Sequence, residues 1–224
     1  MTAAPLRVLF AGVKWPPETF LARLIRGLAG EGLRVTVATW GRPDAAWRSM
    51  PNVDFLYTPS WSGSVGGRLL RLGEQAGRAA LRSPSAAGRT LAAARAPDDS
   101  MRAMERAYRW LPFVGRRWDV IYFPWNATAI TYAPLMETAP AVISCRGAQI
   151  NVSPHNPDRA TLRDGLRDTF ARAAAVHCVS EAIRDEATRY GLDPAKAVVI
   201  RPAVDVEVFR PGVARPGVAR LGVA

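Results

Sequence analysis

The sequence contains few of the residues that form disulfides and metal sites. Among 224 residues there are two cysteines and two histidines, and their spacing matches no zinc-binding pattern. Neither C-x-x-C nor H-E-x-x-H occurs, so we expect no metal site. Cys145 and Cys178 each lie inside an apolar, strand-like run, which predicts buried and reduced thiols.

Long apolar runs are also missing. None approaches the ~20 residues that a membrane-spanning helix needs. The first residues, MTAAPLRVLFAGVKW, show neither the basic start nor the small-residue cleavage site of a signal peptide, and we interpret them as the first strand. Together these absences predict a cytoplasmic protein.

The motifs that cradle nucleotide phosphates do not occur. The loop after the first strand, AGVKWPPE, has one glycine where a dinucleotide-binding G-x-G-x-x-G would stand, and no G-x-x-x-x-G-K-[ST] is present. The stretch SWSGSVGG (60–67) does not have the G-x-S-x-G order of a hydrolase elbow, and we interpret it as a flexible loop. We therefore expect no bound cofactor.

The charge of the chain is strongly basic and unevenly spread. The formal net charge is +11, and only two of the 30 basic residues are lysines. Between residues 66 and 117, eleven arginines stand against four acidic residues, a local excess of +7. Such an excess predicts an anionic partner: a phosphate, a nucleic acid or a lipid head group. Nucleic acid is disfavoured, because the segment has few aromatic residues and no recognition motif.

The first part of this basic segment has helical spacing. One face would carry Leu69, Leu72, Ala76 and Ala80, and a neighbouring stripe would carry Arg68, Arg71, Arg78 and Arg82. A basic amphipathic helix suits an anionic membrane surface. The alternative is a solvated arginine face whose leucines pack on the rest of the domain.

Apolar runs and amphipathic stretches alternate along the chain. Helices are expected at 20–28, 128–138, 162–173 and 181–190, with Ser180 capping the last and Gly191 ending it. Strands are expected at 6–13, 33–40, 53–59, 119–125, 141–147, 174–180 and 197–202. This alternation predicts an α/β fold: a Rossmann-like, doubly wound, mostly parallel sheet of about seven strands.

Candidate binding residues follow from the rule that open parallel sheets bind ligands beyond the carboxyl ends of their strands. Lys14 and Arg146 would hold phosphates or sugar hydroxyls, and Trp15 would stack on a sugar face. Trp125 could stack in the same way, but packing is the favoured interpretation. Glu181 stands at a helix start, where a carboxylate also stabilises the helix dipole.

The same edge supplies four further candidates, Gly12, Asn126, Gln149 and His155. His155 lies in the polar loop NVSPHNPD, where a titratable ring suits a binding site, although a solvated loop histidine is equally compatible. His177 lies within a strand and is interpreted as a hydrogen-bonded core histidine.

One long stretch resembles a known family. AAVHCVSEAIRDEATRYGLDPAKAVVIRPAVDVEVFRP is similar to the closing part of the N-terminal domain in family-4 retaining glycosyltransferases of the GT-B fold. The first strand with its PPE loop, DVIYFPWNATA and VISCRGAQINVSPHNP are also similar to that group. The resemblance covers roughly residues 6–211 and is weaker between 59 and 117.

The resemblance implies one half of a two-domain enzyme. In this family the N-terminal domain mainly holds the acceptor and the C-terminal domain holds the nucleotide-sugar donor. The candidate residues above would then face the acceptor and the cleft. The PxxVDxxxF pattern, which marks the crossing into the donor domain, matches Pro202, Val204, Asp205 and Phe209. Phe123-Pro124-Trp125 stands where relatives place a histidine or acid, so no catalytic base is identified.

The chain would therefore divide into residues 1–209, an N-terminal glycosyltransferase domain with a basic helical insertion at 66–117, and the RPGVA repeats of 210–224, expected to be disordered. We expect a truncated or split acceptor-side glycosyltransferase that is inactive or nearly so alone. Its expected partners are a nucleotide sugar, a sugar or lipid-linked acceptor, and a separate donor-domain chain. The alternative is a non-catalytic module that binds an acceptor, a partner chain or the anionic inner face of the membrane.

Overall fold

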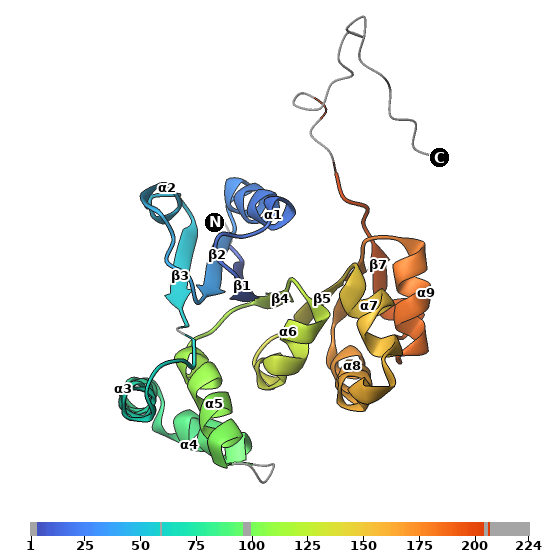
Figure 1. The fold of residues 1–224 in the computed structure, drawn as a ribbon. Helices are drawn as coiled ribbons and strands as arrows, with labels where there is room; N and C mark the ends of the chain where they lie inside the picture. The colour runs from blue at the N-terminus through green and yellow to red at the C-terminus, as the bar shows by residue number, and fades with distance from the viewer. Residues whose placement is uncertain (1–3, 59, 96–99, 204–205, 207–224) are drawn as a thin grey trace, which may run out of the picture.

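A single parallel sheet organises the protein (Figure 1). The computed structural model describes residues 4–58, 60–95, 100–203 and 206. Within them every paired strand is parallel, in the order β3-β2-β1-β4-β5-β6-β7. The strands are β1 Arg7–Val13, β2 Arg34–Thr39, β3 Val53–Tyr57, β4 Val120–Phe123, β5 Ala141–Cys145, β6 Ala175–Cys178 and β7 Ala197–Val199. The predicted Rossmann-like α/β fold is confirmed.

Helices connect the strands. They are α1 Thr19–Gly30, α2 Ala45–Arg48, α3 Val65–Arg82, α4 Pro84–Arg95, α5 Ser100–Trp110, α6 Asn126–Thr131, α7 Ala148–Asn151, α8 Ala160–Arg172 and α9 Glu181–Arg189. Short 3-10 helices occupy Leu111–Phe113, Ala133–Glu137, Ser153–His155, Pro157–Arg159 and Pro194–Lys196. None of the described helices combines the length and the hydropathy needed to cross a bilayer.

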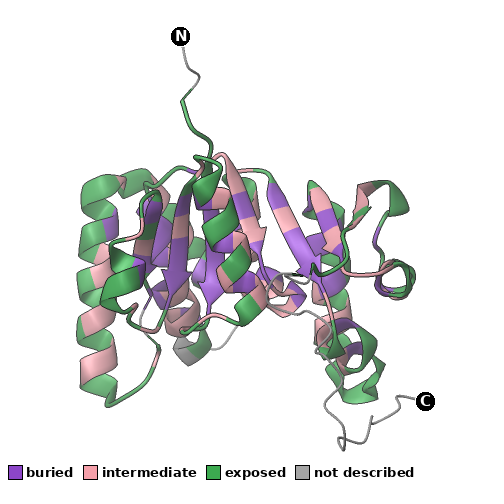
Figure 2. Cartoon of the chain, turned by 90° about the horizontal axis from the view of Figure 1, so that it is seen from above, coloured by how far each residue is buried: buried purple, intermediate pink, exposed green. Residues whose placement is uncertain are grey.

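The two faces of the sheet are buried by different helices. Alternate side chains of the first strands, such as Phe10 and Val37, join Leu21 and Ile25 of α1 in one cluster. The opposite side chains, such as Ile121, form a larger cluster with residues of α6, α8 and α9. Figure 2 shows the strands largely buried between these layers. The continuous apolar runs of the sequence are explained by this burial on both faces.

Helices α3, α4 and α5 form a lobe beside β3 (Figure 1). They meet through small side chains, with Ala79, Ala87 and Ala107 buried in a third cluster. The prediction of a loop over 60–67 is wrong for its last residues, because α3 already begins at Val65. Ser64 caps this helix, and its side chain accepts a hydrogen bond from the amide of Gly67 at 3.3 Å.

The predicted apolar face of α3 is also displaced. Leu72 and Ala76 are half-buried, but Leu69 and Ala80 are exposed and Ala79 is buried in their place. The small Ala79 lets α3 approach α4 closely, so the helix is rotated relative to the face that its leucines predicted.

Two local predictions have different outcomes. The helix expected at 128–138 begins earlier, at Asn126, and stops at Thr131; the 3-10 helix that follows contains Pro134, which has no amide hydrogen to donate. The stop and start signals of α9 are confirmed. Ser180 accepts from the amide of Ile183 at 3.3 Å, and Gly191 has φ of +93°.

Of the PxxVDxxxF pattern that follows β7, the structure describes Pro202. Val204, Asp205 and Phe209, and the repeats of 210–224, lie outside the described residues.

Candidate functional site

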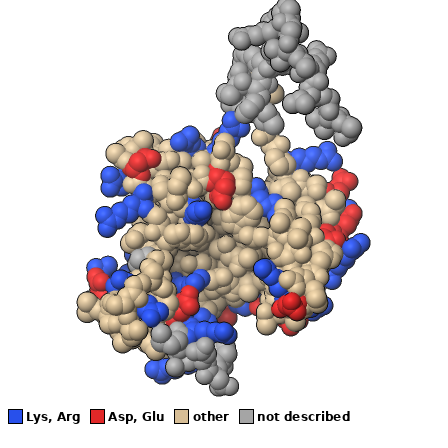
Figure 3. Space-filling model, viewed as in Figure 1, with Lys and Arg blue, Asp and Glu red and all other residues tan. Residues whose placement is uncertain are grey.

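The strand order reverses between β1 and β4, and the carboxyl ends of these strands diverge there. Such a switch point is where open α/β sheets bind ligands. The space-filling view of Figure 3 shows a hollow near the centre of this face of the molecule. Lys and Arg side chains are spread around it. Two cavities among the described residues open near the carboxyl edge.

The first, which we call the switch-point cavity, has a volume of about 340 Å³. It lies between the ends of β1, β2 and β3 and the helices α5 and α6. Its main lining residues are Gly12, Trp40, Thr58, Trp61, Arg109 and Tyr132. Indole faces, hydroxyl groups and one guanidinium are the groups that a polyhydroxylated ligand requires, because they stack on its apolar faces and hydrogen-bond its hydroxyls.

Gly12 determines how closely β1 approaches α6. Its φ is +71°, and a Cβ atom there would lie 2.5 Å from Cγ2 of Thr128 and 3.1 Å from the ring of Tyr132. Only glycine fits such a contact without displacement of α6. The predicted site residue Gly12 therefore lines the switch-point cavity.

The other aromatic residues of this cavity were missed by the sequence analysis. Trp40 follows β2 directly and is substantially exposed, so the rule about carboxyl ends could have identified it. Trp61 lies beyond β3 in a loop, and no local pattern points to it. Its ring packs on Tyr108 of α5, with 5.0 Å between centroids.

The second cavity, about 460 Å³, lies between α1 and the ends of β5–β7, and we call it the Arg146 cavity. Its lining includes Phe20, Leu24, Arg146, His177 and Ile200. The Arg146 guanidinium lies 3.8 Å above the ring of Phe20, and its Nη2 donates to Oγ of Ser144 at 2.9 Å. Burial lowers the pKa of Arg146. The predicted residue Arg146 is thus a half-buried cation at the carboxyl edge.

The His177 ring is surrounded by polar groups close to Arg146: the Tyr122 hydroxyl, Oγ of Ser144 and the carbonyl of Ile200. Its Nε2 donates to the carbonyl of Ile200 at 3.0 Å, which leaves Nδ1 to accept from the Tyr122 hydroxyl at 3.1 Å. Oγ of Ser144 lies 3.3 Å from the same Nδ1. Burial lowers the pKa of His177, and the nearby positive charge of Arg146 acts in the same direction. The predicted hydrogen bonding of His177 is confirmed, but the ring is half-buried and lines a cavity.

Trp15 and Lys14 line neither cavity. Trp15 packs between Trp47 and Phe55, with centroids 5.2 Å from each and nearly perpendicular rings. Its indole is half-buried and packs against the core cluster of β1–β3, and its expected stacking on a sugar stays a prediction. Lys14 is exposed at the end of β1.

Asn126 and Gln149 fasten α6 to α7. Asn126 is completely buried, and its Nδ2 donates to the Gln149 carbonyl at 3.1 Å. Oε1 of Gln149 accepts from the amide of Ala127 at 3.2 Å. Their expected contact with a ligand stays a prediction.

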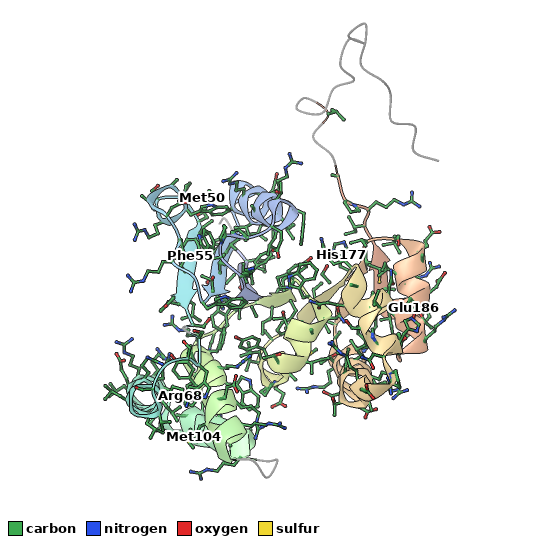
Figure 4. All side chains as sticks on the ribbon, in the orientation of Figure 1. Met50, Phe55, Arg68, Met104, His177 and Glu186 are labelled. Atoms are coloured by element: carbon green, nitrogen blue, oxygen red, sulfur yellow. The ribbon has the colours of Figure 1, made fainter. Side chains whose placement is uncertain are left out.

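His155 packs against α9, and Glu181 is the first residue of that helix. Nε2 of His155 is 2.8 Å from Oε1 of Glu186, which Figure 4 shows on this outer helix, and its ring stacks edge-on against Tyr190. Glu181 is exposed in the first turn, 3.7 Å from Nη2 of Arg201. Neither residue lines the two cavities, so the structure does not bring them together with Gly12 or Arg146.

The two thiols are buried and unpaired, as predicted, although Cys145 and Cys178 are neighbours on β5 and β6. Burial raises the pKa of Cys145, and it raises the pKa of Cys178 to about 11. Over the described part of the chain, no group of three or more His, Cys, Asp and Glu side chains is placed to bind a metal ion.

Comparison with known proteins identifies related folds. The family model described as Glycosyltransferase Family 4 matches residues 17–208. A glycosyltransferase from Rickettsia africae is 12% identical with a TM-score of 0.51, over 96% of this chain and 47% of that one. Anabaena HepE, solved with UDP and glucose, is 16% identical with a TM-score of 0.48, over 91% and 46%. The chain thus spans about half the length of these structures. A search of curated proteins found no match.

Proposed function

The chain belongs to glycosyltransferase family 4, and from this premise we propose that it forms the acceptor side of an enzyme that transfers a sugar from a nucleotide sugar to an acceptor hydroxyl, with retention of configuration. The domain concerned is residues 1–209. Since the chain spans about half the length of the structures it matches, we propose that a donor-binding domain completes the cleft. The chain alone would transfer sugar slowly or not at all.

The switch-point cavity carries this proposal. Its volume of about 340 Å³ suits one or two sugar rings. The indoles of Trp40 and Trp61 offer apolar faces for stacking, and the hydroxyls of Thr58 and Thr131 offer hydrogen bonds to a sugar. The acceptor would therefore enter between the ends of β1–β3 and α6.

The cations at the edge would serve the donor. A nucleotide diphosphate leaves with negative charge, and positive groups placed where this charge develops lower the barrier. Arg146 is half-buried, so its attraction for a phosphate is screened less than that of a surface side chain. Lys14, exposed at the end of β1, would add a second charge. We assign no catalytic base.

Saccharide binding tests the acceptor proposal. Purified chain is applied to an array of immobilised mono- and oligosaccharides, beside the variants Trp40→Ala and Val152→Ala. Trp40→Ala should weaken saccharide binding about tenfold or more, because a large ring contact is lost. Val152 is exposed and lines neither cavity, so its variant should bind as the parent does. Absence of saccharide binding, or binding that ignores Trp40, contradicts the proposal.

A specific observation also favours contact with a membrane. Val65, Leu69, Leu70 and Leu81 of α3 are all exposed, and Leu70 and Leu81 share the side of the helix that faces away from the packed lobe, where Leu81 is 90% exposed. Arginines occupy the neighbouring side of the same helix, and Figure 3 shows Lys and Arg side chains on the helical lobe as well as elsewhere on this face. An amphipathic helix of this kind inserts apolar side chains below anionic head groups. We propose that α3 holds the domain at the inner face of the membrane, near a lipid-linked acceptor.

Vesicle flotation tests this second proposal. The double variant Leu70→Gln/Leu81→Gln should bind phosphatidylglycerol vesicles at least about tenfold more weakly than the parent. The matched control is Leu6→Gln/Val152→Gln, which removes two exposed apolar side chains outside α3. Equal flotation of the two double variants would exclude α3 as the contact.

A further inference from the structure

A cavity beside the helical lobe is lined by arginines. It has a volume of about 590 Å³ and lies between β3, α3 and the turn after α5. Four guanidinium-bearing residues line it, Arg71, Arg78, Arg82 and Arg116, and we call it the arginine basin. In Figure 4 the labels Phe55 and Arg68 mark the strand side and the helix side of this region. Ser60 lines both the basin and the switch-point cavity, and their other lining residues differ.

The positive charge of the basin is largely uncompensated by carboxylates. Among the described residues that line the basin, Glu74 is the one acidic residue, and Oε1 of Glu74 pairs with Nη2 of Arg78 at 2.5 Å. Arg71 donates instead to the carbonyl of Ser62. Burial lowers the pKa of Arg82, and repulsion from Arg116 and Arg78 lowers it further. A bound anion would relieve this repulsion.

Backbone carbonyls hold two of these arginines, Arg82 and Arg116, in place. Nε of Arg82 donates to the carbonyl of Val114 at 2.9 Å, and Nε of Arg116 donates to that of Pro112 at 3.1 Å. The turn closes tightly here, because Gly115 has φ of +74° and a Cβ on it would lie 2.8 Å from Cβ of Arg82. Cations fixed before a ligand arrives lose less entropy on binding it.

A buried hydroxyl also faces this region. Tyr108 lines the basin and is only 1% exposed, yet its hydroxyl has no hydrogen-bond partner of normal geometry, although Arg71 and Gln75 lie near it. Buried polar groups without partners are uncommon and call for an explanation. A ligand oxygen that enters past Arg71 and Gln75 would give this hydroxyl a partner of normal geometry.

We propose that the arginine basin is a binding site for a phosphate-bearing ligand. Guanidinium groups match phosphate oxygens in paired hydrogen bonds, and four of them suit a diphosphate better than a single carboxylate. The phosphate can belong to a soluble diphosphate or to the head group of a lipid beside α3. This inference does not depend on sugar transfer.

Two binding measurements separate these sources. Inorganic pyrophosphate is titrated into the chain by calorimetry at low salt, and vesicles of phosphatidylcholine with and without phosphatidic acid are tested by flotation. Arg71→Gln/Arg78→Gln should weaken binding about tenfold to a hundredfold in whichever assay reports it. The control Arg89→Gln/Arg95→Gln makes the same charge change on exposed residues of α4 that do not line the basin.

A second variant guards against loss of folding. Tyr108→Phe removes only this hydroxyl, which has no hydrogen bond of normal geometry, so the variant should fold normally by circular dichroism and still bind pyrophosphate or phosphatidic acid more weakly. Binding of pyrophosphate that the basin variants weaken supports a soluble ligand, and binding of phosphatidic acid alone supports a lipid head group. Failure to bind either probe, or equal loss in the control, overturns the proposal.

Discussion

Gly12 and Thr128 are in contact at the switch point, where the strand order of the sheet reverses between β1 and β4. A Cβ atom on Gly12 would lie 2.5 Å from Cγ2 of Thr128. This contact joins the end of β1 to the helix α6 at the switch point. The width of the switch-point cavity depends on it, because Gly12, Thr128 and Tyr132 all line that cavity.

Replacing this glycine should destabilise the domain. Gly12→Ala adds a methyl group into the contact and places alanine at φ of +71°. Left-handed backbone and overpacking each cost about 1–3 kcal/mol, so we expect a loss of about 2–6 kcal/mol in the free energy of unfolding, measured with urea.

Two further variants separate the causes. Thr128→Ser in the Gly12→Ala background removes the clashing Cγ2 and should restore part of the loss. Gly77→Ala, in the middle of α3 with open space around it, should be neutral or stabilising by about 1 kcal/mol. An unchanged stability of Gly12→Ala would mean that β1 and α6 are not in close contact.

His177 should make stability depend on pH. Its pKa is lowered in the folded protein, so the unfolded chain binds more protons as the pH falls. The stabilisation is complete above the ordinary histidine pKa near 6.5 and is lost as the pH drops below it. His177→Gln should flatten this part of the stability curve. Ser180→Ala, which removes a helix cap worth about 1 kcal/mol, should lower the curve without changing its slope.

The ion pair of Arg7 and Asp119 should make the stability of the fold depend on pH in a lower range than His177 does. Nη2 and Nε of Arg7 and its amide all donate to the carboxylate, which lowers the pKa of Asp119 to about 2. The unfolded carboxyl titrates near 4, so the pair stabilises the fold above that pH and loses its effect as the pH falls toward 2. Asp119→Asn should be less stable than the parent at pH 7, and the two should converge in acid unfolding experiments. A constant difference across this range would exclude the pair as its cause.

The thiols should be inert in the folded protein. Cys145 and Cys178 are fully buried, and their raised pKa values leave little thiolate at pH 8. We expect no reaction with a thiol-specific disulfide reagent in native buffer and reaction of both thiols in urea. Rapid labelling of the native protein would show that the carboxyl end of β5 is open.

The strands were predictable because burial on both faces leaves continuous apolar runs, as in β1 and β5. The orientation of α3 was not predictable from the sequence. Hydrophobicity favours burial of Leu69, but the packing buries the smaller Ala79. Local pattern does not reveal which small residue allows two helices to approach.

The site was predictable only in outline. The carboxyl-end rule selected Gly12 and Arg146, which line cavities, and Trp15, whose half-buried indole packs against Trp47 and lines neither cavity. Space for that indole comes from Gly41, since a Cβ there would lie 2.4 Å from Cβ of Trp15. Trp61 was missed because its place in the cavity depends on packing against α5, far along the chain.

Photoaffinity mapping tests the location of the acceptor site most directly. Diazirine-tagged glucose and N-acetylglucosamine are irradiated with the chain, and the labelled peptides are identified by mass spectrometry. The account predicts label on the residues that line the switch-point cavity, with loss of label in Trp40→Ala; they include Thr58, Ser60, Trp61, Ala127, Thr128, Thr131 and Tyr132. Label concentrated on α9, or label unaffected by competing untagged sugar, would contradict it.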